Sequence, residues 1–422
     1  MAETAPKPKR ELPKSRQMVN EMTAKVYADA WEAKRRGEPV AWSTAIFPLE
    51  VPETFGINVL YPENNAAAVS AKHYGDGLIA HAEGALRYPI NICSYARLNL
   101  GMADKLRDAA FDGADPLMPL PDLLFLANNS CTQLMKWYEN LARDLDIPIF
   151  FVDCLYRYDE GELEPHRIAY GRGQIEKLIA DLEVFLGKKF DWDRFLEVQK
   201  RAQINTKLFD ECVALNSTKP SPMDGFDLFS YMAPQVICRG KEITTAIFEQ
   251  WKAETLERIA SGTTTFRGEE KYRVHWEGIA CWPNLSYNLK TLSSYGINAV
   301  INGYVTAWSL HYEPGDLDGM ARAYQTASTN SLSTQAIMDK RSKTIEDYAC
   351  DGMLCHVNRS CKLMTFHIFV GREMIEEKNG VPVANFDGDQ SDGRVFSEAQ
   401  FETRLQAMTE IMAERKRTEG VK

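Results

Sequence analysis

Short apolar runs alternate with amphipathic segments along the first part of the chain. After a charged start, SRQMVNEMTAKVYADAWEAKRR has helical periodicity and ends at Gly37 and Pro39. Four apolar runs of strand type follow: VAWSTA, INVLYPE, PDLLFLA and IPIFFVD. Between them, NNAAAVSAKHYGDGLIAHAEGALR and CTQLMKWYENLARDLD repeat apolar residues at helical spacing. This alternation predicts a parallel sheet with helices on both faces.

A long stretch of helical periodicity interrupts the alternation from about Gly171 onward. It is broken once by KPSPMDGFD, with two prolines, and it closes with TTAIFEQWKAETLERIASG. Strand-type runs then return as KYRVHWEGIACWP, INAVINGYV, DGMLCHV and VPVANFDGD. We therefore predict an α/β protein with two Rossmann-like domains, each built on a parallel sheet. The expected division is 1–165 for the first helix and α/β domain, 166–265 for a helical segment, and 266–422 for the second α/β domain.

Composition narrows the class of protein further. With 422 residues, 45% of them hydrophobic, the chain can bury a large core. Its net charge of -10 argues against a nucleic-acid partner bound through phosphate neutralisation. The first residues lack the apolar segment of a signal peptide, and no apolar stretch reaches membrane-spanning length. We expect a cytoplasmic protein with neither a nucleic-acid nor a membrane partner.

Three of the nine cysteines stand where a strand-type run gives way to a helical segment. Cys93 ends the run YPINIC, Cys131 follows PDLLFLANNS, and Cys361 follows DGMLCHVNRS. Ligands of open parallel sheets bind beyond the carboxyl ends of the strands. The amino terminus of a helix also stabilises a thiolate through its partial positive charge. These three thiols are therefore candidate ligands that two domains could bring to one cleft.

The other cysteines carry less information, because a buried cysteine is most often a small apolar core residue. Cys355 lies inside a strand-type run and Cys212 inside a helical one, so we expect both to be structural. The pattern leaves four undecided: Cys154, Cys238, Cys281 and Cys350. The acidic stretch FDGDQSDGR lacks the spacing of a calcium loop, and we expect a solvated turn there. No phosphate-binding loop, HExxH zinc motif or GxSxG nucleophile elbow is present in the sequence.

Several motifs together resemble the α subunits of the 2-hydroxyacyl-CoA dehydratases, whose wider superfamily includes ATP-dependent benzoyl-CoA reductase subunits. The resemblance extends from about Arg16 to Arg415. The motifs that carry it are AWSTAIFP, NVLYPENNAA, ICSYAR, NNSCTQLMKWYENLARDLDIP, PSPMDGFDLFSYMA, FRGEEKYRVHWEGIACWP, NRSCKLM, FDGDQSD and QFETRLQ.

The resemblance implies an iron-sulfur cofactor. Each subunit of this family carries a 4Fe-4S cluster, and its three motif cysteines match Cys93, Cys131 and Cys361. The cluster is then expected in the cleft between the two α/β domains. Three thiolates leave one of four irons without a protein ligand, and an open iron can act as a Lewis acid on a substrate oxygen.

The reaction implied is a radical dehydration of a (R)-2-hydroxyacyl-CoA to the (E)-2-enoyl-CoA. One electron enters the thioester carbonyl, and the resulting ketyl radical expels the α-hydroxyl group. The implied partners are a homologous β subunit with a second cluster and, transiently, an ATP-dependent iron-sulfur activator protein. Two alternatives stay open: an aryl- or enoyl-CoA reductase subunit of the same superfamily, and a non-catalytic subunit that binds CoA esters or relays electrons.

Further site residues follow from the same motifs. Glu63 is expected either to orient a ligand or move a proton, or else to cap a helix. Related α subunits usually carry serine where this chain has Ala45, and its hydroxyl helps hold the water or hydroxide on the open iron. Here Ser43 and Thr44 are the neighbouring hydroxyls. Residues expected around the cluster are Asn129, His356, Arg359 and Ser360, with His356 alternatively a core histidine. Three tryptophans could shield the cluster or belong to the core: Trp42, Trp282 and Trp308.

Overall fold

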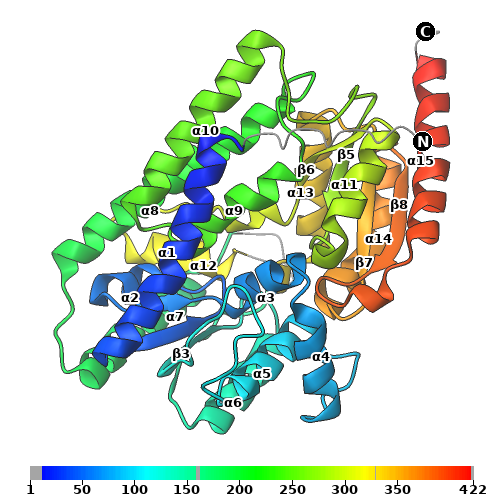
Figure 1. The fold of residues 1–422 in the computed structure, drawn as a ribbon. Coiled ribbons are helices and arrows are strands. Elements are labelled where there is room, and N and C mark those ends of the chain that lie inside the picture. Colours follow the sequence, from blue (N-terminus) through cyan, green and yellow to red (C-terminus); the bar gives the residue numbers. More distant parts are fainter. Residues whose placement is uncertain (1–11, 158–161, 328, 420–422) are drawn as a thin grey trace.

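Two four-stranded parallel sheets form the framework of the molecule in a computed structural model, which describes residues 12–157, 162–327 and 329–419 (Figure 1). The first sheet has the order β2-β1-β3-β4 and the second β6-β5-β7-β8. Their strands are β1 Val40–Ser43, β2 Asn58–Leu60, β3 Leu123–Ala127, β4 Ile149–Val152, β5 Tyr272–Glu277, β6 Ile297–Asn302, β7 Gly352–Asn358 and β8 Val383–Gly388. All strand pairs are parallel, so the expected α/β class with two parallel sheets is confirmed.

Both sheets use the same strand order: second, first, third and fourth along the chain. In each sheet the connections therefore run in opposite directions on either side of the first strand. Such a reversal opens a crevice beyond the carboxyl ends of the strands, where ligands bind. Cys131 follows the third strand of the first sheet and Cys361 follows the third strand of the second, so the two thiols hold equivalent positions.

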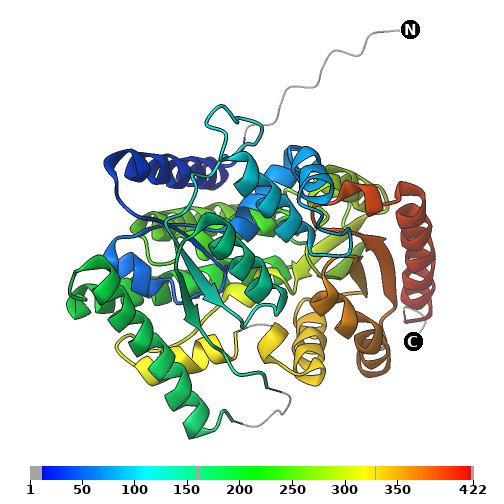
Figure 2. The same cartoon turned by 90° about the horizontal axis from the view of Figure 1, so that it is seen from below.

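Helices cover the sheets and fill the region between them (Figure 2). The α-helices are α1 Lys14–Arg36, α2 Glu50–Phe55, α3 Pro62–Ala71, α4 Gly75–Gly84, α5 Ser94–Lys105, α6 Gln133–Leu145, α7 Pro165–Leu186, α8 Trp192–Ala214, α9 Asp227–Ile237, α10 Glu242–Ser261, α11 Leu285–Ser294, α12 Leu317–Gln325, α13 Thr334–Asp347, α14 Lys362–Asn379 and α15 Glu398–Glu419. A short 3-10 turn, η3, spans Val305–Trp308. None of the helices in the described part of the chain is long and apolar enough to cross a membrane. The proposed division of the chain into three segments stays a prediction.

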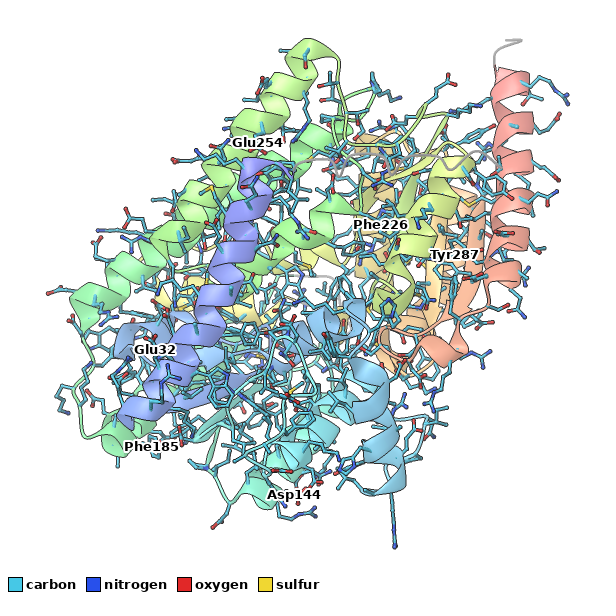
Figure 3. All side chains as sticks on the ribbon, viewed as in Figure 1. Glu32, Asp144, Phe185, Phe226, Glu254 and Tyr287 are labelled. Atoms are coloured by element: carbon cyan, nitrogen blue, oxygen red, sulfur yellow. The ribbon has the colours of Figure 1, made fainter. Side chains whose placement is uncertain are left out.

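The first helix, α1, packs against α9 and α10 of the helical segment as well as against the first sheet. Helix α1 packs beside α9 and α10, far away in the sequence. At its start, the backbone N–H and the hydroxyl of Ser15 donate to the two carboxylate oxygens of Glu254, at 3.0 and 2.6 Å. Figure 3 labels Glu254 where α10 lies beside this end of α1. The helix ends as expected at Gly37, whose φ of 72° few other residues adopt.

Two expected elements differ from the structure. The single helix expected over residues 64–87 is two helices, α3 and α4, because His73 takes a left-handed conformation with φ 63° and interrupts the hydrogen-bond ladder. The strand expected at YPINIC is absent, since these residues form a turn in which the N–H of Ile92 donates to the carbonyl of Pro89. Cys93 therefore precedes helix α5 as expected, but it does not end a strand.

Candidate functional site

Three thiols from distant parts of the chain line one cavity of about 110 Å³ between the two sheets. Cys93 directly precedes α5, Cys131 lies two residues before α6, and Cys361 directly precedes α14. Apolar and aromatic side chains make up most of the remaining wall, among them Ile46, Leu134, Trp137, Ile279, Leu363 and Met364. The fold thus gathers in one place the three cysteines that the helix-start pattern singled out.

Each thiol faces the first turn of the helix that follows it. Burial raises the pKa of Cys93 to about 12, while the backbone N–H groups of Tyr95 and Ala96 act in the opposite direction. Burial likewise raises the pKa of Cys131 and Cys361. Without a metal these groups are thiols at neutral pH, and coordination is what removes the proton.

The arrangement suits a cluster better than a single ion. No group of three or more His, Cys, Asp or Glu side chains within the described ranges converges closely enough to hold one metal ion. A four-iron cluster binds each thiolate through a different iron, so its ligands stand apart around a central body. Three thiols spread over the wall of one largely apolar cavity, each with helix-start N–H groups behind it, fit that geometry.

Glu63 stands where the thiol cavity meets a second, larger cavity of about 910 Å³. Its carboxyl oxygen accepts the backbone N–H of Ala45 at 2.8 Å. Burial raises the pKa of Glu63 to about 8, and the Ala45 N–H opposes the rise. Tyr304 and Trp308 border both cavities as well. A carboxyl group that keeps its proton at neutral pH therefore lies at the junction of the two spaces.

The hydroxyl groups of Ser43 and Thr44, beside Ala45, do not point into either cavity. The Ser43 hydroxyl donates to the carbonyl of Thr44 at 3.0 Å. The Thr44 hydroxyl accepts the backbone N–H of Ala127, also at 3.0 Å, and thereby ties β1 to the end of β3. Both residues are buried and line neither cavity. Of Ser43, Thr44 and Ala45, Ala45 alone lines the larger cavity.

The four residues predicted to surround the cluster all form contacts with other parts of the protein: Asn129, His356, Arg359 and Ser360. The Ser360 hydroxyl accepts the N–H of Ser94 at 3.0 Å and so joins the starts of α14 and α5. The Asn129 amide donates to the carbonyl of Tyr324 at 3.1 Å. His356 is buried between the carbonyl of Ile279 and the thiol of Cys281, outside the thiol cavity. Arg359 keeps 62% of its side chain exposed and pairs with Asp387, so it does not reach the thiols.

The three tryptophans separate into two kinds. Trp42 is fully buried in the first sheet and donates to the carbonyl of Pro119. Trp282 and Trp308 line the larger cavity, and Trp308 also lines the thiol cavity. The six remaining cysteines are all buried and none of them lines the thiol cavity: Cys154, Cys212, Cys238, Cys281, Cys350 and Cys355.

The acidic stretch FDGDQSDGR is buried over residues 389–392, and there the prediction of a solvated turn is wrong. Asp389, Gln390, Ser391 and Asp392 each expose 2% or less of their surface. Gln390 lines the thiol cavity, and its side-chain N–H donates to the sulfur of Cys93 at 3.1 Å. The carboxylates are instead used internally, because Asp389 accepts backbone N–H groups from the loop itself.

Arg341 is a second cavity residue that the sequence pattern does not single out. Its guanidinium donates to the fully buried carboxylate of Glu277 at 2.6 Å, and His367 approaches the same carboxylate at 3.1 Å. The guanidinium rests against Gly303, where a Cβ would lie 2.6 Å from two of its nitrogens. Arg341 is thus fixed in the wall of the thiol cavity by contacts between residues far apart in the chain.

The chain is similar to known proteins over almost its whole length. The family model for the 2-hydroxyglutaryl-CoA dehydratase D-component matches residues 44–412. The chain is 44% identical to the (R)-2-hydroxyisocaproyl-CoA dehydratase alpha subunit of Clostridioides difficile, over 96% of this chain and 98% of the relative. It is 40% identical to the (R)-phenyllactyl-CoA dehydratase alpha subunit of Clostridium sporogenes (96% and 97%) and 38% identical to the lactoyl-CoA dehydratase subunit alpha of Anaerotignum propionicum (94% and 96%). The chain therefore belongs to the family of 2-hydroxyacyl-CoA dehydratase α subunits, a family of hydro-lyases.

Proposed function

We propose that this chain is the catalytic subunit of a radical (R)-2-hydroxyacyl-CoA dehydratase and holds a 4Fe-4S cluster on Cys93, Cys131 and Cys361. The observation that carries the proposal is the convergence of these three thiols on one cavity. When bound, such a cluster supplies a low-potential electron and one iron open to a substrate oxygen. The apolar wall excludes water, which strengthens every electrostatic interaction inside.

Glu63 is the residue that we assign to proton transfer. Its raised pKa keeps the carboxyl group protonated at neutral pH. Glu63 lines the same cavity as the three thiols, so its carboxyl group would lie beside a substrate oxygen bound there. The Ala45 N–H holds one carboxyl oxygen, so the other is free to orient toward the cavities. A protonated carboxyl group can give its proton to a departing hydroxyl group.

The larger cavity is our candidate for the acyl-CoA substrate. Its volume of about 910 Å³ is within the usual range for small-molecule sites, and it joins the thiol cavity at Glu63, Tyr304 and Trp308. Tyr27, Trp31, Ala67 and Phe229 contribute apolar wall. Among the charged lining residues, Lys72 pairs with Asp115 at 2.7 Å, and Arg16 adds a further positive charge. A mostly apolar cavity with the guanidinium of Arg16 in its lining suits a thioester whose remote end carries phosphates.

The proposed assembly is a heterodimer with a homologous β subunit that carries a second cluster. The relatives are named as alpha subunits, which supports a partner of this kind. The electron would come from a separate ATP-dependent iron-sulfur activator protein, and the sequence accordingly contains no nucleotide-binding loop of its own. We propose that this assembly works in the cytoplasm.

Iron and acid-labile sulfide analysis of the anaerobically purified heterodimer tests the cluster. Cys93→Ala, Cys131→Ala and Cys361→Ala should each lower the iron content of this chain from about four irons and abolish dehydration. Cys355→Ala is the matched control, because Cys355 is buried in β7 away from the cavity, and it should keep its iron. Full iron content in any of the first three variants would remove that cysteine from the ligand set.

Product analysis separates dehydration from net reduction. A dehydratase should convert a (R)-2-hydroxyacyl-CoA to the 2-enoyl-CoA and water with only catalytic amounts of electrons. A stoichiometric demand for reductant would instead place the chain with the reductases of the superfamily.

A further inference from the structure

The side chain of Gln390 has a defined orientation toward one of the three thiols. Its amide N–H donates to Cys93 Sγ at 3.1 Å, although the two residues lie almost three hundred positions apart in the chain. Its amide oxygen accepts the side-chain N–H of Asn358, the last residue of β7. Since the oxygen is engaged by Asn358, the donating end of the amide faces the sulfur.

The loop that carries Gln390 is braced on both sides. The Asp389 carboxylate accepts the backbone N–H groups of Ser391 and Asp392, each at 3.0 Å, and that of Ser360 at 3.1 Å. Gly388, the last residue of β8, fits so closely that a Cβ would lie 2.7 Å from Cys281 Sγ and from His356 Nε2. The loop is therefore locked to the turn that places Cys361, and Gln390 has little freedom to move away from Cys93.

A hydrogen bond to a ligand sulfur favours the reduced form of an iron-sulfur cluster. Reduction adds negative charge that spreads onto the thiolates, and a fixed N–H donor stabilises that charge. The bond therefore raises the reduction potential of the cluster that it touches.

We infer that Gln390 tunes the reduction potential of a cluster bound at Cys93 by donating this hydrogen bond, and that Asn358 positions its amide. The inference rests on the proposed function, because it needs a cluster on the three cysteines. Gln390 acts on the cluster directly, whereas Asn358 acts only through Gln390.

The test is an anaerobic redox titration of the purified heterodimer, followed by electron paramagnetic resonance, with iron counted in the same samples. Gln390→Leu removes the donor at similar volume, and Gln390→Glu replaces it with a carboxylate. We expect the midpoint potential to fall in the order wild type, Gln390→Leu, Gln390→Glu, with iron content unchanged. Asn358→Asp leaves Gln390 in place but removes the N–H that orients it, and should shift the potential in the same direction by less.

Gln133 offers a matched control in the same cavity. It also contacts Cys93, but its amide oxygen accepts the backbone N–H at 3.2 Å and gives nothing to the sulfur. Gln133→Leu removes an amide from the cavity without removing a donor to the thiolate, so its potential should stay closer to that of the wild type.

The outcomes distinguish this inference from the proposed function. A wild-type protein without iron would overturn the proposed function itself. Wild-type iron with an unchanged potential in Gln390→Leu and Asn358→Asp, or a shift no larger than that of Gln133→Leu, would overturn the inference alone. If Gln390→Leu and Asn358→Asp both lose iron while Gln133→Leu keeps its iron, the inference is also overturned. In that case Gln390 would be needed to hold the cluster in the protein, not to tune its potential.

Discussion

A negative charge on Glu63 has almost no compensation from its surroundings. Within the described residues the Ala45 N–H is the one hydrogen bond that stabilises the carboxylate, and burial outweighs it. By contrast, the buried carboxylate of Glu277 has Arg341, His275 and His367 around it, and despite burial its pKa is well below the ordinary value. Two glutamates near the same cavity, one lining it and one behind its wall, therefore have opposite protonation states at neutral pH.

The raised pKa of Glu63 predicts a pH-dependent stability. Between about pH 4.5 and 8 the folded protein keeps a proton that the unfolded chain has released, so the free energy of unfolding falls as the pH rises. From pH 6 to pH 8 this loss amounts to about 2 kcal/mol. Glu63→Gln should lack it, which urea unfolding of the metal-free wild type and variant at both pH values can measure. Parallel pH dependence in the two proteins would contradict the assignment.

Helices α4 and α5 show how an element positions the site. They pack side by side, and α5 begins next to Cys93. At Gly101, in the middle of α5, an added Cβ would collide with the backbone carbonyl of Leu78 in α4. The close approach of these helices therefore depends on a single missing side chain.

Gly101→Ala should force α4 and α5 apart and lower the free energy of unfolding by about 1–3 kcal/mol. Gly84→Ala is the control on the partner helix, because an added Cβ there meets nothing within 4 Å. That variant should change stability by less than about 1 kcal/mol. Chemical denaturation of both variants compares the two, and equal effects would argue against the tight contact.

At the scale of the whole molecule, long-range contacts join the two sheets around the thiols. Ser94 bonds to Ser360, and Ser70 bonds to Ser391 at 2.7 Å. Arg97 of α5, with 1% of its side chain exposed, pairs with Asp392 at 3.1 Å. Together they connect α5 to the turn before Cys361 and connect both α3 and α5 to the loop that carries Gln390.

Asp392→Asn should weaken that connection and lower the free energy of unfolding by about 1–3 kcal/mol. Burial opposes ionisation of Asp392, but the guanidinium groups of Arg394 and Arg97 outweigh it and lower the pKa. The carboxylate therefore stabilises the fold above its ordinary pKa, and this stability is lost as the pH falls through the lowered value. Denaturation at neutral and acidic pH should show the variant and wild type converging in acid.

The elements that depend on the local pattern of residues could be predicted from the sequence. The third strands of both sheets and the helix starts after Cys131 and Cys361 follow from neighbouring residues, and so the strand-to-helix turns were predictable. The pattern correctly predicts a helix start after Cys93, but the strand that it predicts before Cys93 is a turn in the structure. Gln390, Tyr304 and Arg341 could not be predicted, because each reaches the cavity through contacts with distant segments.

The wide separation of the three thiols along the chain has a consequence for biosynthesis. The ribosome makes Cys93 and Cys131 early, whereas Cys361 emerges only after the entire helical segment and most of the second sheet. A nascent chain that has not reached α14 offers two thiols and no cavity. With the proposed ligand set, the cofactor is therefore loaded only after α14 has been made, and the machinery that delivers iron and sulfide must act after that point.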